Sequence, residues 1–108
     1  MLYELRIYHC MPGKLPALLT RFETVTVALF EKHGIQQVGF WTVAIGESTA
    51  DLYYILKWDS LDEREKKFAI FAADPAWIAA RAKSEEAGPL VASITNSILT
   101  PTKFSALK

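Results

Sequence analysis

The segment of residues 52–58 constrains the fold of this chain more than any other part of its sequence. Its side chains alternate as those of a β-strand do, and both sides of the strand are apolar. One side carries Leu52, Tyr54, Leu56 and Trp58, and the other carries Tyr53 and Ile55. An antiparallel strand with one face in water has a polar side, so we expect this strand to lie in a sheet that is covered on both faces.

Three other segments are predicted to be strands. Residues 3–9 alternate in period two, until a proline and a glycine break the pattern. Residues 38–44 are apolar on both faces, and a hairpin loop joins them to the strand at residues 52–58. The last strand covers residues 90–99. The chain therefore contains enough strands for a four-stranded sheet.

Three segments follow the helical period instead. A helix of about 18 residues starts at Lys14 and ends before Gly34, a favoured C-cap residue. Its apolar stripe consists of Leu15, Leu18, Leu19, Phe22, Val25, Leu29 and Phe30. A second helix covers residues 61–73, with Ser60 as its N-cap. A third, shorter helix begins at Asp74-Pro75, because aspartate caps helices and proline fits their first position.

The predicted order is strand, helix, strand, strand, helix, short helix, strand. These helices can form only one layer, which covers one face of the sheet. The other face is also apolar and must leave water. A second copy of the chain, packed sheet against sheet, is the simplest cover, so we expect a homodimer or a higher homo-oligomer.

Composition excludes several classes of protein. Twelve basic residues cancel twelve acidic ones, which argues against nucleic acid as a partner. Cys10 is the single cysteine and cannot form an intrachain disulfide. No apolar run approaches the roughly 20 residues of a membrane span, and no secretory leader precedes the first strand. We therefore expect a cytoplasmic location.

Several short blocks, taken in order, resemble those of the NIPSNAP family. They are Tyr3-Glu4-Leu5-Arg6-Ile7-Tyr8 followed by Pro12-Gly13-Lys14, His33-Gly34 with Val38-Gly39-Phe40-Trp41, Ser60-Leu61-Asp62-Glu63-Arg64, Asp74-Pro75-Ala76-Trp77, and Asn96-Ser97-Ile98-Leu99 before Phe104-Ser105. The resemblance extends over nearly the whole chain, which implies one domain over residues 1–108.

This resemblance implies an α+β fold of the ferredoxin-like βαββαβ type. It has a four-stranded antiparallel sheet with helices on one face, and two copies pair into a dimeric α+β barrel. The same architecture is found in small monooxygenases, haem-degrading enzymes and proteins without an assigned reaction. Function must therefore be inferred from the residues of the site and not from the fold.

The first strand carries a polar set, Glu4, Arg6 and Tyr8, on one side. We expect these side chains to point away from the helices and into the dimer barrel. Burying Leu5 and Ile7 under the helices would stabilise the fold by about 1.5–3 kcal/mol each, whereas Glu4 and Arg6 would lack partners there. The set then either binds an anion and moves a proton, or forms an ion pair within the dimer.

Three further residues are candidates for ligand binding. Arg64 lies on the apolar stripe of the second helix, either as an anion anchor at a pocket rim or as a side chain that covers apolar surface and bonds a carbonyl or a carboxylate. Trp41 and Tyr54 belong to a group of aromatic residues that line a cavity or form the core. That group also includes Trp58, Trp77, Phe68 and Phe71.

No metal site, cofactor or catalytic nucleophile is predicted. His9 and His33 are the only histidines, and neither has a second ligand at metal-binding spacing. A single histidine can hold haem without any spacing signature, but these two are more simply a strand-end residue and a helix C-terminal cation. Cys10 follows His9 directly and therefore points to the opposite face, away from this base.

Two functions of different classes remain open. In the first, the chain binds a small organic molecule in or beside the barrel, or oxidises it without a cofactor as small monooxygenases of this fold do. In the second, it is a non-catalytic assembly or protein-interaction module, and the polar residues only hold the dimer. A cavity of about 300 Å³ or more favours the first, and a barrel filled by Trp and Tyr favours the second.

Overall fold

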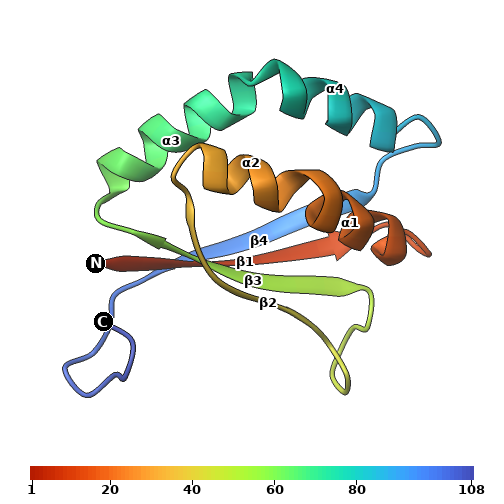
Figure 1. Ribbon diagram of the computed structural model, residues 1–108. Coiled ribbons are helices and arrows are strands. Elements are labelled where there is room, and N and C mark those ends of the chain that lie inside the picture. The colour runs from red at the N-terminus through yellow and green to blue at the C-terminus, as the bar shows by residue number, and fades with distance from the viewer.

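The computed structural model describes residues 1–108, in which four antiparallel strands form one sheet (Figure 1). The strands are β1 (Leu2–Cys10), β2 (Gln36–Thr42), β3 (Asp51–Trp58) and β4 (Val91–Leu99). Their order across the sheet is β2-β3-β1-β4, as the ferredoxin-like fold requires. The first strand is therefore central, with β3 on one side and β4 on the other.

The strand β2 begins and ends earlier than residues 38–44, the range expected from the sequence. Its pairing with β3 ends where Thr42 lies opposite Leu52, and the chain then leaves the sheet. A shift of register between Gln37 and Gly39 lies within the strand. This irregularity interrupts the simple alternation on which the expected boundary depended.

The first long helix has three parts, α1 (Leu15–Arg21), the π-helical turn η1 (Phe22–Thr26) and α2 (Val27–Lys32). The predicted length is confirmed, but the π turn shifts the phase of the buried side, since each hydrogen bond of such a turn spans one extra residue. Val25, predicted to lie on the apolar stripe, is only half-buried, whereas Thr26 is buried.

The other two helices are α3 (Leu61–Ala73) and α4 (Pro75–Ser84). Both predicted N-caps are confirmed. The Ser60 hydroxyl accepts a hydrogen bond from the Glu63 backbone N–H at 3.1 Å. The Asp74 carboxylate accepts one from the Ala76 backbone N–H at 2.9 Å. Because Asp74 lies between the two helices, it ends one and starts the other. No helix combines the length and the hydrophobicity needed to traverse a lipid bilayer.

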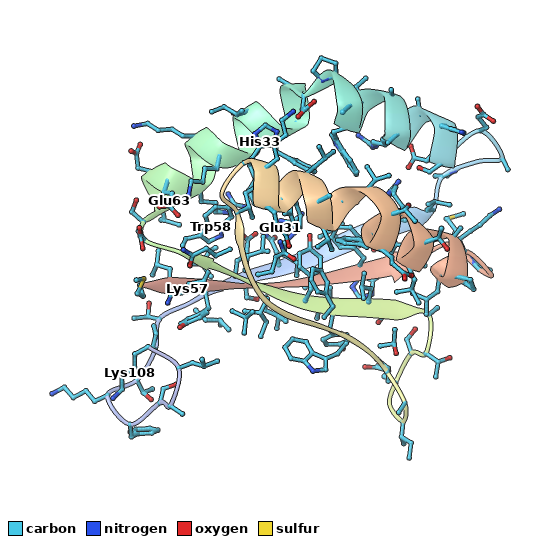
Figure 2. All side chains as sticks on the ribbon, viewed as in Figure 1. Glu31, His33, Lys57, Trp58, Glu63 and Lys108 are labelled. Atoms are coloured by element: carbon cyan, nitrogen blue, oxygen red, sulfur yellow. The ribbon has the colours of Figure 1, made fainter.

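The helices form a single layer on one face of the sheet, and the core lies between the two (Figure 1). The two sides of the strand β3 differ in burial. Tyr54 and Trp58 are fully buried beneath the helices, and Trp58 lies between sheet and helices in Figure 2. Tyr53 and Ile55, on the other side of the same strand, are half-buried. We call this second side of the sheet the open face, because no helix covers it.

Candidate functional site

The polar set of β1 lies beneath the helices and not on the open face, so the expected direction was wrong. Glu4 is fully buried, and its carboxylate contacts Arg64 of α3. Arg6 lies against the ring of Phe68, also on α3, at 5.2 Å. Leu5 and Ile7 therefore face the open side, where they remain half-buried.

The reason is that Glu4 has partners that come from distant parts of the chain. Arg64 donates two hydrogen bonds to the carboxylate, from Nε at 2.7 Å and from Nη2 at 3.0 Å. Trp58 Nε1 and Asn96 Nδ2 donate at 3.0 Å each, and Arg6 Nη1 donates at 2.9 Å. With five donors the buried charge is compensated, and the expected penalty for an unpaired charge does not arise.

These contacts determine the protonation of Glu4. Burial by itself would raise the pKa of this carboxyl, but the hydrogen bonds from Arg64, Asn96 and Arg6 outweigh burial and lower the pKa to about 2. Glu4 is therefore a carboxylate at neutral pH, held between two guanidinium groups. Of the two interpretations left open for Arg64, the structure favours a side chain that bonds a carboxylate.

Arg6 connects this carboxylate to two phenols. Its Nε donates to the Tyr54 hydroxyl at 2.7 Å, and its Nη2 donates to the Tyr8 hydroxyl at 3.3 Å. The two hydroxyls are 2.9 Å apart and share one hydrogen bond. Each phenol carries one hydroxyl proton, and both hydroxyls accept from Arg6. One of the two protons forms the bond between the hydroxyls, so the other proton is left over.

The burial of the two phenols decides which of them carries the spare proton. Tyr54 is fully buried, so a donor without an acceptor there would cost about 1–3 kcal/mol. Tyr54 therefore donates to Tyr8. The Tyr8 hydroxyl, at the end of the chain Glu4–Arg6–Tyr54–Tyr8, keeps a proton that no group in the protein accepts.

A cavity of about 490 Å³ lies beside Tyr8, between the sheet and the helices α1 and α4. We call it the Tyr8 cavity. It is lined by Tyr8, Arg21, Trp77, Arg81, Glu85, Pro89, Val91, Ala92, Ser93 and Ile94. Sequence reasoning found only Tyr8 among its polar residues. Arg21 follows Leu18 by three positions, and this spacing is the sequence signal that places Arg21 on the buried side of the helix.

The aromatic candidates separate into two groups. Tyr54, Trp58 and Phe71 belong to the core, and Phe68 and Trp77 pack against it. Trp41 lies opposite Tyr53 in the β2–β3 pair, on the open face, with half of its surface exposed. The six residues therefore do not line one cavity, because β2 turns the Trp41 side chain away from the helices.

The two histidines bind neighbouring polar groups. His9 contacts Asp51 through Nδ1 at 3.1 Å and Thr95 through Nε2 at 2.8 Å. His33, in the last turn of the first helix, contacts Asp74 through Nε2 at 2.7 Å. The two histidines thus lie in separate clusters.

The fold and its polar chain define the class of this protein: a ferredoxin-like α+β domain with a buried carboxylate–guanidinium–phenol chain that ends at a cavity. The family model of NIPSNAP matches residues 3–106. The chain belongs to the NIPSNAP family.

Individual relatives agree with this assignment. The mouse protein NipSnap homolog 3B is 32% identical over 75 residues, which are 69% of this chain and 30% of the mouse protein. The chain thus spans under a third of that relative's length. The crystal structure of Atu4242 from Agrobacterium tumefaciens is similar over 100% of both chains, at 30% identity and a TM-score of 0.88.

The fold extends beyond this family. A putative antibiotic biosynthesis monooxygenase from Nitrosomonas europaea has a TM-score of 0.62 over 94% of this chain and 98% of its own, at 8% identity. At such an identity the likeness concerns the fold alone.

Proposed function

We propose that this protein binds a small organic molecule in the Tyr8 cavity, with the Tyr8 hydroxyl donating a hydrogen bond to it. The observation that carries the proposal is the spare proton of Tyr8, because this residue lines the cavity. A donor held in place by Arg6 and Tyr54 needs no rearrangement to meet a carbonyl or carboxylate oxygen of a ligand.

The size and lining of the cavity support the same function. Its volume of about 490 Å³ lies within the roughly 300–1,000 Å³ of small-molecule sites. Trp77, Pro89, Val91 and Ile94 provide an apolar wall, whereas Arg21, Arg81 and Glu85 bring charged groups to the cavity. An apolar wall beside polar groups that can orient a ligand supports binding over a purely structural role for the polar residues.

We propose binding and not cofactor-free oxidation, although the Nitrosomonas europaea protein shares the fold. An oxidation that starts with removal of a proton from the substrate needs a positioned base within hydrogen-bond reach of that proton. Glu85 is the only carboxylate among the cavity residues, and it lies 3.7 Å from Arg21 and 3.5 Å from Arg81. The carboxylate is thus the shared counter-ion of two guanidinium groups.

We also infer that the binding unit is a homodimer joined through the open faces. This face carries both projections and hollows: Ile45 is 97% exposed and Phe104 is 89% exposed. Hollows of about 420 Å³ beside Trp41 and about 380 Å³ beside Tyr3 lie on the same face. A two-fold axis would bring the projections of one copy to the hollows of the other, and this supports a second copy as the cover of the open face.

The binding proposal is tested with Tyr8→Phe, which keeps the ring but removes the spare proton together with the acceptor of the Tyr54 hydroxyl. The probes are phenylacetamide and acetophenone, two neutral aromatic molecules whose oxygen accepts a hydrogen bond. In wild-type protein we expect them to shift the backbone amide resonances of Val91, Ser93 and Ile94 in ¹H–¹⁵N spectra. In Tyr8→Phe the affinity falls by roughly three- to tenfold, the equivalent of one hydrogen bond.

Tyr53→Phe is the matched control, because Tyr53 lies on the open face of the neighbouring strand. It should leave the affinity of both probes unchanged. The proposal is wrong if neither probe shifts the resonances of the cavity residues, or if Tyr8→Phe and Tyr53→Phe bind the probes equally well.

A further inference from the structure

Arg21 is an unusual residue in this protein. Its side chain is only 7% exposed, and its Nε is the one buried side-chain nitrogen or oxygen atom of the chain without a hydrogen-bond partner. Buried polar atoms are almost always paired, so an unpaired atom on a charged group needs an explanation. A ligand that compensates the charge of this buried guanidinium is such an explanation.

The contacts that Arg21 does make leave its charge only partly compensated. Nη1 donates to the Ser84 hydroxyl at 3.2 Å, and the nearest carboxylate oxygen, of Glu85, is 3.7 Å away. Arg81 approaches the same carboxylate at 3.5 Å. Both distances exceed the roughly 2.7–2.9 Å of charge-assisted hydrogen bonds. Two guanidinium groups thus share one carboxylate, and one positive charge remains.

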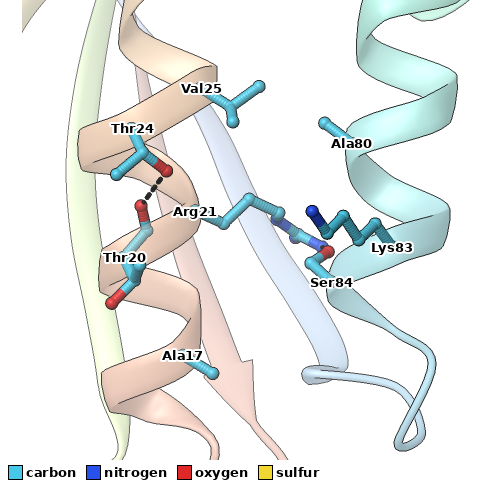
Figure 3. A pocket seen from close by; sticks show the side chains of 8 residues that line it. All are labelled: Ala17, Thr20, Arg21, Thr24, Val25, Ala80, Lys83 and Ser84. Atoms are coloured by element: carbon cyan, nitrogen blue, oxygen red, sulfur yellow. Dashed lines mark hydrogen bonds between the residues drawn. The ribbon is translucent and has the colours of Figure 1, made fainter.

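The fold holds Arg21 firmly where it is. The residue ends α1 just before the π turn, and the Thr26 hydroxyl donates to its backbone carbonyl at 3.3 Å. Its guanidinium lies over the ring of Trp77 at 5.3 Å. Figure 3 shows the side chain reaching from α1 toward Ser84 on α4. Arg21 thereby lines both the Tyr8 cavity and a groove of about 470 Å³ between the two helices.

We propose that Arg21 binds the carboxylate of an organic acid whose apolar body lies in the Tyr8 cavity. This inference rests on the proposed function, and it names the chemical class of the ligand. The guanidinium of Arg21, whose Nε has no partner within the protein, lines the cavity and supplies the donors for the carboxylate, and the Trp77 ring fixes the plane of the guanidinium. Trp77, Val91 and Ile94 contact the apolar part of the acid. A single excess charge matches a monoanion, which favours a carboxylate over a phosphate.

The experiment compares phenylacetate with phenylacetamide, which has the same shape and no charge. Affinities come from ¹H–¹⁵N titrations, and the Arg21 Nε–H resonance reports binding at the guanidinium. In wild-type protein phenylacetate binds at least tenfold tighter than phenylacetamide and shifts the Nε–H resonance, since a hydrogen bond to a charged group has about this effect. Inorganic phosphate serves as a third probe and binds more weakly than phenylacetate.

Two variants and a control separate charge from shape. Arg21→Met abolishes the preference for phenylacetate, and Arg21→Lys retains part of it, because lysine keeps the charge without the planar donor fork. Lys66→Met removes an exposed cation of α3 and leaves the preference unchanged. Arg21→Met also keeps the protein folded, since it removes a buried charge that lacks full compensation.

The outcomes distinguish this inference from the proposed function. If both probes shift Val91, Ser93 and Ile94 with equal affinity and the Arg21 Nε–H resonance does not move, the cavity binds small molecules but Arg21 does not select acids. If phenylacetate moves the Arg21 resonance but no probe moves the β4 residues, the anion site exists outside the Tyr8 cavity and the proposed function is wrong. Tighter binding of phosphate than of phenylacetate contradicts the carboxylate assignment.

Discussion

Glu4 shows how a carboxylate is accommodated beneath a layer of helices. Five donors from β1, β3, β4 and α3 surround it, and two of the donors belong to the bidentate guanidinium of Arg64. Bonds of this kind are short, charge-assisted and directional. One side chain therefore joins three strands and a helix, and the loss of its charge weakens the hydrogen bonds to all four elements.

The acid stability of the protein should depend on Glu4. Its pKa is about 2 in the folded protein and about 4.3 in an unfolded chain, so the unfolded state binds more protons between these values. The resulting stabilisation, about 3 kcal/mol, is complete above pH of about 5 and is lost as the pH falls toward 2. Urea unfolding at a series of pH values measures it.

In Glu4→Gln we expect the loss of stability between about pH 5 and pH 2 that is due to Glu4 to disappear. The variant is less stable than wild type at neutral pH, because an amide replaces the charged acceptor of two guanidinium groups. The two proteins then converge in stability at low pH. An unchanged slope between pH 5 and pH 2 in the variant would contradict the role given to this carboxylate.

At the scale of elements, Asp74 is the residue through which three helices meet. Its carboxylate accepts from the Ala76 backbone at the start of α4, from Lys32 Nζ at 2.9 Å and from His33 Nε2 at 2.7 Å. These hydrogen bonds hold the pKa of Asp74 well below its usual range, and the bond from Lys32 contributes most. The aspartate is a helix cap and also a link from α2 to α4.

We therefore expect Asp74→Ala to destabilise the protein more than Ser60→Ala. The serine caps α3 and makes no contact beyond the cap, so its loss costs about 1 kcal/mol. The aspartate variant loses a cap and the link together. Asp74→Asn retains the cap and recovers part of the stability. Equal urea midpoints for Asp74→Ala and Ser60→Ala would show that the link to Lys32 and His33 does not stabilise the fold.

At the scale of the whole molecule, the proposed homodimer depends on the open face. The protein has no net charge at neutral pH, and this face exposes Trp41, Ile45 and Phe104. We expect sedimentation at micromolar concentration to give about twice the mass of the chain, and Trp41→Glu to reduce it to the mass of one chain. Tyr8→Phe, on the other side of the sheet, should leave the dimer intact. A compact monomer of the wild-type protein would refute the homodimer.

The fold should not depend on a metal ion or a disulfide. No group of three His, Cys, Asp or Glu side chains is arranged to hold a metal, and Cys10 is free. A chelator and a reductant should therefore each leave the melting temperature unchanged. A fall of several degrees with the chelator alone would reveal a metal site that the residues do not indicate.

Much of the fold could be predicted from the sequence because it depends on local patterns. The period of the apolar residues, the caps Ser60 and Asp74, and the glycine at position 34 indicated the helices. The two apolar sides of residues 52–58 indicated a sheet that needs a cover on both faces. Each of these signals acts between residues that are close in sequence, where geometry follows directly from spacing.

The direction of the polar set on β1, by contrast, was decided only by the tertiary structure. The sequence alone made a buried Glu4 look costly, because its partners Arg64 and Asn96 are 60 and 92 positions away. The same holds for Arg21, whose unpaired Nε is apparent only once α4 lies beside it. The sequence by itself therefore determined the elements and their order. The tertiary structure decided which side of β1 the helices cover, since the free energy of a buried charge depends on donors that only the folded chain brings together.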